Sequence, residues 1–422
     1  MIKVGIIGVG TVGSSVVNIL QKNRDIITAR AGKEITPVFG IVKNLNKNRG
    51  VDIPLSCDVD DILEDDSIDV VVELMGGVDE AFEVVKKALM KGKSVVTANK
   101  AMLAYHRYEL QESANNQAIG FEASVAGGIP IIKALREGLS ANHIESIKGI
   151  MNGTCNYMLT KMMSDGVEFD EILKEAQELG YAEADPSFDV GGFDAAHKLL
   201  ILASIAYGID AKPEDILIEG IEDINSEDIF FANEFGYNIK LLTIAKKSKD
   251  SVELRVHPAL IRKSEMIAKV DGVMNGVSVV GDCVGETMYY GPGAGGDATA
   301  SAVIADIIDI VRNDNNSPML GFKKILKNDV LRLKNSDEIF TKYYVRVEVE
   351  DRVGVLSGIS NILGEHNISI NSFLQKQSEN EKHATLLFST HECYEKDIQN
   401  AIKKINSCDF VRKKSAMIRI EE

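Results

Sequence analysis

The first 130 residues alternate short apolar, β-branched runs with stretches in which apolar residues recur at helical spacing. The apolar runs lie in IKVGIIGVG, TPVFGIVKNL, IDVVVELMGG, KSVVTANKA and QAIGFEASVAGGIPII. Between them, SSVVNILQKN and EAFEVVKKALMKG have the apolar spacing of helices. Buried strands separated by helices are typical of a parallel sheet covered on both faces. The pattern therefore predicts an α/β domain over residues 1–130.

Beyond residue 130 the pattern changes to a mixture of helices and strands. The run FDAAHKLLILASIAYG predicts a long apolar helix, whereas VELRVHPAL and NGVSVVGDCVG have the composition of strands. We expect a second, α+β domain over residues 131–320. The glycine-rich YYGPGAGG precedes an apolar helix near residues 297–312, which we expect to pack back on the first domain.

The tail has its own order of elements. We predict strands at residues 343–350, 369–376, 384–390 and 410–420, and helices at 354–365 and 395–406. This βαββαβ order is that of a ferredoxin-like module. We assign it to residues 341–422, joined by a linker at 321–340. A chain that stops after about residue 330 is therefore expected to stay folded.

The charge balance excludes several classes of partner. The 47 Lys and Arg residues against 63 Asp and Glu give a formal charge of −16, which disfavours nucleic acid and anionic membranes as partners. The glycine-studded N-terminus lacks the features of a signal peptide, and the apolar run at 199–207 is too short to span a bilayer. We expect a cytoplasmic protein. Five widely spaced cysteines favour reduced thiols, and the scattered histidines do not suggest a transition-metal site.

A glycine motif follows the first predicted strand and precedes a predicted helix. Gly8, Gly10 and Gly13 form GxGxxG, in which the first glycine allows a tight turn and the second lets a pyrophosphate approach the backbone. The third permits close packing of the helix on the strand, and the helix N-terminus offers free N–H donors. The pattern predicts a dinucleotide site. The alternative is a glycine turn in an α/β fold that binds no nucleotide.

The second predicted strand ends at Lys43, where an NAD-selective site usually presents an acid to the ribose 2′-hydroxyl. No acid stands there. Lys43, with Lys47 or Arg49, could instead meet a 2′-phosphate, which favours NADP while NAD stays possible. The alternative is a solvated basic loop.

A run of acids precedes one lysine in GYAEADPSFDVGGFDAAHKLLILA. Asp194 and Lys198 are four residues apart on the predicted helix and share one face near its start. A lysine among apolar neighbours can have its pKa lowered toward a range useful for proton transfer, and close carboxylates raise it again. Two interpretations stay open at this point, a ligand site and a surface ion pair beside a solvated acidic loop.

Seven motifs in this order resemble homoserine dehydrogenase over about residues 1–320. They are GVGTVG, VVVELMGG, TANKA, EASVAGGIPII, MNGTCNYMLT, GYAEADPSFDVGGFDAAHKL and YYGPGAGGDATASAV. From YYVRVEVEDRVGVLSGISNILGEHNISINSFLQK onward the chain resembles an ACT regulatory domain. The resemblance implies an α/β protein with a Rossmann-type dinucleotide-binding domain, an α+β catalytic and dimerisation domain and a C-terminal ferredoxin-like ACT domain. The chain departs from the family at Ala298 and Val353, where proline is common.

The resemblance also implies roles for individual positions. Lys198 matches the lysine that donates and accepts the proton, Lys100 matches a second lysine between cofactor and substrate, and Glu183 and Asp194 match acids that hold the substrate's ammonium group. The implied substrate positions are Glu183, Asp189, Asp194, Gly153, Thr154 and Tyr181. The cofactor positions are Gly8, Gly10, Thr11, Val12, Gly13, Lys43, Lys100, Gly180 and Gly295. A monovalent cation, usually sodium, is expected on main-chain oxygens of Glu122, Val125, Gly127 and Ile129.

The implied reaction is the NAD(P)-dependent interconversion of L-aspartate 4-semialdehyde and L-homoserine in threonine, methionine and isoleucine biosynthesis. The ACT resemblance implies paired ACT domains in a homo-oligomer, a dimer or tetramer, and an amino-acid effector such as threonine at residues 351–354. Two other functions are conceivable. An amino-acid sensor without turnover would not need Lys100 and Lys198, and a dehydrogenase of another amino or sugar substrate would not need Glu183 beside Asp194.

Overall fold

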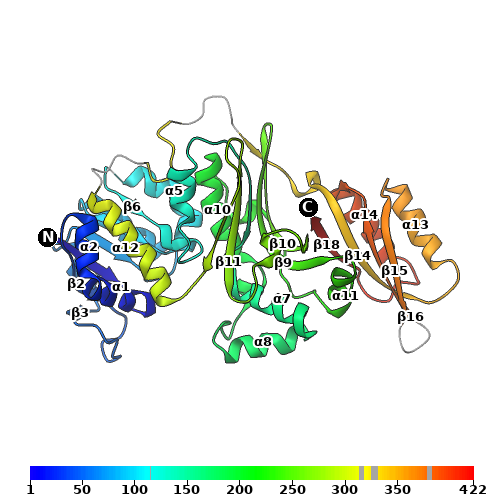
Figure 1. Cartoon of the computed structure of the whole chain (residues 1–422), viewed down its shortest axis with the longest axis horizontal. Coiled ribbons are helices and arrows are strands. Elements are labelled where there is room, and N and C mark those ends of the chain that lie inside the picture. Colours follow the sequence, from blue (N-terminus) through cyan, green and yellow to red (C-terminus); the bar gives the residue numbers. More distant parts are fainter. Residues whose placement is uncertain (115, 313–317, 325–330, 378–382) are drawn as a thin grey trace. The chain divides into compact units, whose positions relative to one another are not determined.

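The computed structural model describes residues 1–114, 116–312, 318–324, 331–377 and 383–422, which form two compact units (Figure 1). Unit 1 comprises Met1–Gly153, Asp194–Asp215 and Val273–Leu331, and unit 2 comprises Thr154–Phe193, Ile216–Gly272 and Arg332–Glu422. Each unit therefore combines stretches that are far apart in the sequence. Residues 325–330 of the expected linker lie outside the described residues.

Unit 1 is built on a six-stranded parallel sheet. Its strands are β1 (Ile2–Ile7), β2 (Ile35–Ile41), β3 (Leu55–Ser56), β4 (Val70–Glu73), β5 (Ser94–Thr97) and β6 (Ile119–Gly120), in the order β3-β2-β1-β4-β5-β6. The helices between them are α1 (Thr11–Lys22), α2 (Arg24–Ala31), α3 (Asp60–Leu63), α4 (Asp79–Met90) and α5 (Lys100–Ser113). The direction of winding reverses between β1 and β4, and ligands of such sheets bind at the carboxyl ends of the strands at that point.

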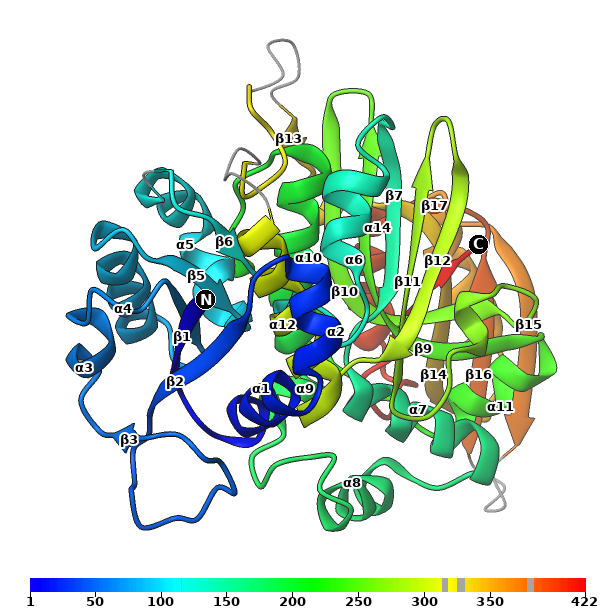
Figure 2. The same cartoon turned by 60° about the vertical axis from the view of Figure 1, so that its left-hand side comes forward.

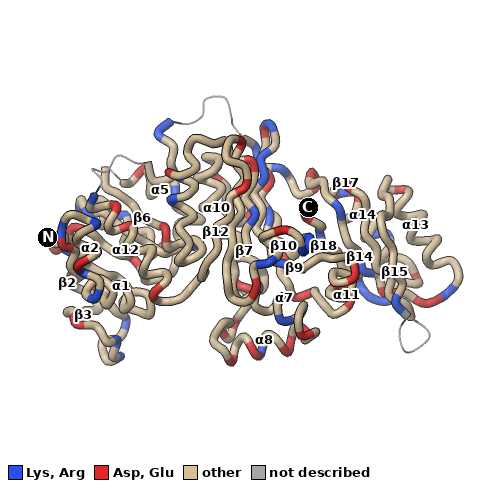
Figure 3. Tube along the Cα trace, viewed as in Figure 1, with Lys and Arg blue, Asp and Glu red and all other residues tan. Residues whose placement is uncertain are grey.

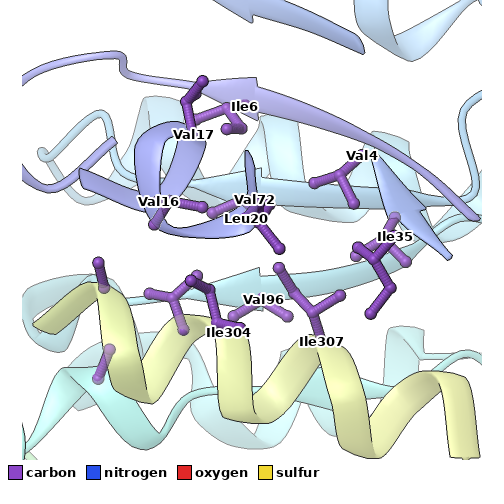
Figure 4. Close-up of a cluster of buried hydrophobic side chains, with 14 of the residues drawn as sticks. Val4, Ile6, Val16, Val17, Leu20, Ile35, Val72, Val96, Ile304 and Ile307 are labelled. Atoms are coloured by element: carbon purple, nitrogen blue, oxygen red, sulfur yellow. The ribbon is translucent and has the colours of Figure 1, made fainter. Parts of the chain in front are cut away.

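Helix α12 (Gly296–Arg312) completes the hydrophobic core of this sheet although it is remote in sequence. Its residues Ala300, Val303, Ile304 and Ile307 are spaced for one helical face, and all four are buried in one cluster with residues of α1 and β1. Figure 4 shows Ile304 and Ile307 directed from α12 toward the side chains of that cluster. The glycine-rich segment before α12 is thereby held against the dinucleotide-binding fold.

The remainder of unit 1 contains antiparallel strands and a buried helix. Strands β7 (Ile144–Ile150), β11 (Met274–Gly281) and β12 (Gly285–Pro292) stand side by side in Figure 2. Helix α10 (Phe193–Tyr207) has 13 buried residues among its 15, as its apolar composition predicts. The short elements are η1 (Glu122–Ser124), α6 (Ile131–Lys133), η2 (Ala134–Gly138) and η3 (Pro213–Asp215). None of the helices in the described part of the chain combines the length and the apolar character needed to cross a membrane.

Unit 2 is organised around a long antiparallel hairpin of β9 (Tyr237–Ser248) and β10 (Ser251–Arg262). Its other elements before the tail are α7 (Gly153–Asp165), α8 (Phe169–Glu178), α9 (Ser187–Val190), β8 (Leu217–Ile218), α11 (Ser226–Glu234) and η4 (Ile267–Lys269). Cys155 on α7 is fully buried, and its Sγ donates to the carbonyl oxygen of Asp189 at 3.2 Å. This packing agrees with a structural cysteine rather than a nucleophile.

The tail has the predicted βαββαβ order, with a short extra strand. Its elements are β14 (Phe340–Glu350), α13 (Val355–Glu365), β15 (Ile370–Gln377), β16 (His383–Thr390), β17 (Cys393–Tyr394), α14 (Glu395–Asn406) and β18 (Ala416–Glu421). The last strand begins at Ala416 and not at residue 410 as predicted. Val411 forms only an isolated bridge with Val349, and Ser415 is tied by its hydroxyl to Asn406, so the chain breaks before it rejoins the sheet.

The tail is joined to the hairpin of unit 2 by strand pairing. Strand β18 pairs in parallel with β10, with Arg419 opposite Ala259, and β13 (Arg332–Leu333) pairs with the start of the same strand. The sheet then continues from β18 through β14 and β16 to β15. Between β13 and β14 lies η5 (Ser336–Glu338). Figure 3 shows charged residues of both signs where β10 and β18 meet, and these include the ion pair between Arg255 and Glu421.

Candidate active site and dinucleotide site

The glycine motif has the geometry that a pyrophosphate site requires. Gly8 has φ +102°, and a Cβ there would lie 2.4 Å from the carbonyl oxygen of Leu74. A Cβ on Gly13 would lie 2.4 Å from the carbonyl oxygen of Gly8, so this position keeps α1 close to β1. Gly10 is exposed and has open space where its Cβ would be. The N-terminus of α1, with Thr11 and Val12, is therefore accessible to an anionic ligand.

A second glycine-rich segment lies beside this helix N-terminus. A Cβ on Gly296 would come within 2.8 Å of Ser15 Oγ and 3.2 Å of Thr11 Cγ2. Gly295 has φ +120°, a conformation that L side chains rarely adopt, and no atom stands where its Cβ would be. The expected cofactor positions of the two glycine motifs are thus brought together within unit 1.

The loop after β2 is basic and exposed. The strand ends at Ile41, and the side chain of Lys43 is exposed. Arg49 folds back over the loop because its Nη1 donates to the carbonyl oxygens of Asn44 and Lys47, each at 2.7 Å. No carboxylate occurs in the segment 42–49. The position that usually meets the ribose 2′-hydroxyl therefore carries positive charge.

Lys100 is placed by a hydrogen-bonded turn at the carboxyl end of β5. Asn99 caps α5, since its Oδ1 accepts from Met102 N at 3.1 Å while its Nδ2 donates to Gly77 O at 2.7 Å. Thr97 Oγ1 donates to the buried carboxyl of Glu73 at 2.6 Å. Burial raises the pKa of Glu73, although these hydrogen bonds oppose the shift. Lys100 is the first residue of α5 and projects from this fixed turn.

Asp194 stands between two lysines. Its Oδ1 lies 2.6 Å from Lys100 Nζ, and its Oδ2 lies 2.7 Å from Lys198 Nζ. Asn152 Nδ2 also donates to Oδ2 at 2.9 Å, and Lys198 Nζ donates to the carbonyl oxygen of Met151 at 2.6 Å. The cluster joins the start of α10, the start of α5 and the end of β7, so it is held by three elements of unit 1.

The electrostatics of this cluster follow from its burial. Asp194 is 3 % exposed, and burial alone would raise its pKa, but the charges of Lys198 and Lys100 outweigh burial and hold the pKa below its ordinary value. The Lys198 side chain is 10 % exposed and that of Lys100 is 37 % exposed. Lys198 is therefore fixed, whereas Lys100 retains contact with solvent. The interpretation of Asp194 and Lys198 as a surface ion pair is wrong, because both are buried.

The other expected substrate residues belong to unit 2. Thr154 Oγ1 donates to the carbonyl oxygen of Tyr181 at 2.6 Å, and Tyr181 packs edge-on against Tyr157. Glu183 is exposed and its main-chain oxygen accepts from Gln177, whereas Asp189 is half-buried. Gly180, an expected cofactor position, has φ +74° at the end of α8. Gly153 instead ends the first of the three stretches of unit 1, and a Cβ on it would lie 2.8 Å from Val273 O.

The expected cation loop has an irregular backbone. Ala126 and Gly127 have successive positive φ values of +52° and +51°. Such a conformation is costly for alanine and turns consecutive main-chain carbonyls away from regular pairing. No group of three or more His, Cys, Asp or Glu side chains in the described ranges is arranged to hold a metal. The backbone is therefore irregular at the segment where the main-chain cation site is expected.

The Glu122 side chain is anchored next to this loop. Its carboxylate accepts from the backbone N–H groups of Ile132 at 2.8 Å and Lys133 at 2.9 Å, and its own N–H donates to Asp306 Oδ2 at 2.8 Å. Burial, with the nearby charge of Asp306, raises the pKa of Glu122 to about 7. The carboxylate of Glu122 therefore ties the loop to α6, and its main-chain N–H ties the loop to α12.

Sequence reasoning did not identify every member of the cluster around Asp194. Asn152 and the carbonyl of Met151 were missed, as was the support of Lys100 by Asn99, Thr97 and Glu73. A polar residue two positions after the end of β7 was the one available signal for Asn152. The Met151 carbonyl has no side-chain signal at all.

Three family models match the chain. The NAD-binding domain of homoserine dehydrogenase matches residues 8–122, the homoserine dehydrogenase domain matches 130–308 and the ACT domain matches 343–410. These matches confirm the predicted fold class of a Rossmann-type domain, a catalytic domain and a C-terminal ACT domain.

Individual relatives agree along the whole chain. A homoserine dehydrogenase of Helicobacter pylori is 56 % identical over 420 residues, which cover 100 % of this chain and 99 % of its own. A homoserine dehydrogenase of Pseudomonas aeruginosa is 44 % identical, over 100 % of this chain and 99 % of its own length. The crystal structure of a homoserine dehydrogenase from Thiobacillus denitrificans superimposes with a TM-score of 0.94 at 45 % identity, covering 100 % of this chain and 98 % of its own. The chain therefore belongs to the homoserine dehydrogenases, which are NAD(P)-dependent oxidoreductases.

Proposed function

We propose that the protein interconverts L-aspartate 4-semialdehyde and L-homoserine, with Lys198 as the group that donates and accepts the proton. The observation that carries this role is the fixed position of Lys198 Nζ, which is buried between Met151 O and Asp194 Oδ2. A bound nicotinamide cofactor supplies the hydride for the aldehyde carbon. Lys198 then provides a proton at Nζ for the developing alkoxide oxygen, directly or through water.

Asp194 and Lys100 set the charge around this proton donor. The carboxylate of Asp194 fixes both ammonium groups and balances part of their charge. Lys100, half-exposed beside it, supplies positive charge that stabilises the oxyanion or aligns the substrate. Glu183 and Asp189, with Asp194, are proposed to hold the substrate's ammonium group, and Gly153, Thr154 and Tyr181 to shape its pocket.

NADP is the proposed cofactor, with NAD as a slower alternative. The exposed Lys43 and the folded Arg49 support this preference, since a dianionic 2′-phosphate is favoured by basic residues where an acid is absent. A hyperthermophilic archaeal homoserine dehydrogenase, 29 % identical to this chain, has been solved in complex with NADPH. Gly10, Thr11, Val12 and the Gly295 segment are proposed to receive the pyrophosphate.

A monovalent cation, sodium in the first instance, is proposed on the main-chain oxygens of Glu122, Val125, Gly127 and Ile129. The support is the irregular backbone at Ala126 and Gly127. An alkali cation there would add structural order and needs no change of charge during the reaction.

Regulation and assembly are proposed from the ACT domain. An end-product amino acid such as threonine would act at residues 351–354, where Gly354 has φ +93°. This site would be shared by paired ACT domains in a cytoplasmic homodimer or homotetramer. The pathway served is the biosynthesis of threonine, methionine and isoleucine.

The test of the reaction is the absorbance of reduced nicotinamide during homoserine oxidation and semialdehyde reduction. Lys198→Ala should lower kcat in both directions by roughly 10² or more, the usual effect of removing a general acid–base group. The melting temperature and cofactor affinity should show that the variant is folded. Near-normal turnover in Lys198→Ala would refute the assignment.

A further inference from the structure

A cavity of about 540 Å³ lies within unit 2, beside the ACT domain. One wall is formed by residues 219–228, from the segment after β8 to the first turn of α11, and the other walls come from β10, β14, α14 and the start of β18. All of its lining residues belong to one unit of a single chain. The volume falls within the ordinary range of small-molecule sites.

Three charged residues of the lining, Glu219, Asp228 and Arg346, already belong to two ion pairs. Arg419 donates to both oxygens of Glu219, at 2.6 and 3.0 Å. Arg346 donates to both oxygens of the fully buried Asp228, which also accepts from Tyr344 at 2.7 Å. These groups position the walls, and they are not available to a ligand without breaking a buried pair.

Three other charged residues of the lining are exposed and have no such partner. Glu222 and Asp223 stand on the wall before α11, and Lys414 stands before β18. Within the described ranges, no ion pair or hydrogen bond is formed by any of these three side chains. The lining therefore offers two carboxylates on one wall and one ammonium on another. Between them, the apolar side chains of Ile402 and Met417 also line the cavity.

We propose that this cavity binds a free α-amino acid, whose ammonium group is held by Glu222 and Asp223 and whose carboxylate is held by Lys414. Both groups of the zwitterion then meet charges of opposite sign, and a modest aliphatic side chain meets Ile402 and Met417. Such charge-assisted hydrogen bonds to an ammonium and a carboxylate are the strong ones in recognition.

This site differs from the turn at residues 351–354. None of those four residues lines the cavity, and Val353 projects fully into solvent. The cavity is complete within one chain, whereas an effector site shared by paired ACT domains needs a second copy. The proposal is therefore independent of the oligomeric state, and it does not depend on the proposed catalytic role of Lys198.

A ligand in the cavity could shift β10, because two strands that lead to the cavity walls pair with it. Strand β8, which leads into the acidic wall, pairs with β10 through Leu217 and Arg255, and β18 pairs with β10 through Arg419 and Ala259. A ligand that draws the two walls together therefore acts on two successive stretches of one strand. Regulation would follow if the two arrangements of these walls differ in affinity for the ligand.

The test is calorimetric titration of the full-length chain with each of the twenty protein amino acids. We expect binding of at least one of them, weakened at least about tenfold by Lys414→Ala and by the double change Glu222→Gln with Asp223→Asn. Lys403→Ala is the matched control, because Lys403 is exposed on α14 and does not line the cavity. The control should bind as the unchanged protein does.

Homoserine oxidation without effector should be unchanged in all of these variants, since none of the residues belongs to the cluster around Asp194. Full binding in Lys414→Ala and in the acid double variant would overturn the proposal. So would the absence of binding by all twenty amino acids. Loss of turnover in Lys198→Ala, with binding retained, bears on the proposed reaction alone and keeps the two hypotheses separate.

Discussion

Replacing Asp194 by asparagine removes one buried negative charge and changes the side-chain shape very little. In the unchanged protein, one carboxylate compensates the ammonium groups of Lys100 at 2.6 Å and Lys198 at 2.7 Å. Asparagine retains one oxygen for Asn152 or a lysine, but it presents an NH₂ group to the other partner. Two positive charges then lie close together without their common counter-charge.

The magnitude follows from the exposure of the two lysines. The Lys100 side chain is 37 % exposed and its ammonium group can be hydrated, so the loss of its ion pair with Asp194 is largely offset by solvent. Lys198 is 10 % exposed and is held at Met151 O, so it is left as an uncompensated buried charge. Breaking a buried pair in this way costs about 3–5 kcal/mol. Lys198 can avoid that cost by leaving its position. If the displaced position is then favoured by about 3 kcal/mol, only about one molecule in 10² holds Lys198 in place, and kcat falls by roughly the same factor.

The assay measures kcat and KM for homoserine, NADPH affinity by fluorescence and thermal unfolding. We expect kcat to fall by roughly 10² or more, with NADPH affinity within about threefold of the unchanged protein. A rise in the homoserine KM alongside would support the additional role of Asp194 in holding the substrate's ammonium group. Asp66→Asn is the control, because Asp66 is an exposed carboxylate of the same unit that does not belong to the cluster around Asp194.

Turnover within about threefold of the unchanged protein, in a folded Asp194→Asn variant, would refute the view that this carboxylate holds the proton donor. An equal loss of NADPH and homoserine affinity would instead assign Asp194 a general structural role. Asp66→Asn should leave the kinetic constants, the NADPH affinity and the thermal unfolding unchanged, which excludes a nonspecific effect of net charge.

Three further outcomes follow from the structure. A chain that ends at residue 331 should fail to unfold cooperatively in a circular-dichroism melt, because it lacks β13 and β18, which pair with β10, and Glu421, which pairs with Arg255; a cooperative melt with full kcat would contradict this. Burial lowers the pKa of His257 well below its ordinary value, so this group should reduce the free energy of unfolding as the pH drops below about 6.5, by up to about 1.4 kcal/mol per unit, since only the unfolded chain takes up the proton there. The raised pKa of Glu122 acts in the opposite direction, so the test compares each variant with the unchanged protein at each pH. In urea titrations, the stability of His257→Gln relative to the unchanged protein should rise as the pH falls below about 6.5, and that of the exposed His391→Gln should stay constant. Lys43→Glu should reduce kcat/KM for NADPH by roughly tenfold and leave that for NADH nearly unchanged, and an equal effect on both cofactors would exclude 2′-phosphate contact.

The parts of the fold that depend on local patterns were predictable. The strand, glycine turn and helix around Gly8, Gly10 and Gly13 lie within a few residues of one another, so their geometry is contained in the sequence motif. The βαββαβ order of the tail follows from apolar periodicity in the same way. Helix α2 was not predicted, because it is only eight residues long, buries only Ile27 and Ala31, and has no side-chain cap to mark its start.

The candidate site was predictable only in part. Helical spacing brings Asp194 and Lys198 together, and the structure confirms their contact. Nothing local relates Lys100 to Asp194, since their contact depends on how α5 and α10 pack, and only the family resemblance singled out Lys100. Main-chain partners such as Met151 O carry no side-chain signal, so no sequence pattern could reveal them.

The expectation of a separable tail rests on local patterns, which do not reveal the contacts between the tail and the rest of unit 2. The sequence separates the tail by a polar segment and gives it a complete set of elements, which suggests an independent module. In the structure, Arg419 is fully buried between Glu395 and Glu219, and Arg255 on β10 is paired with Glu421. Charged residues in a strand look like solvent-facing positions, and only the pairing of β18 with β10 makes them internal. A tail held by buried ion pairs cannot leave without exposing unpaired charges, so movement of the ACT domain must be carried by the shared strands rather than by a free linker.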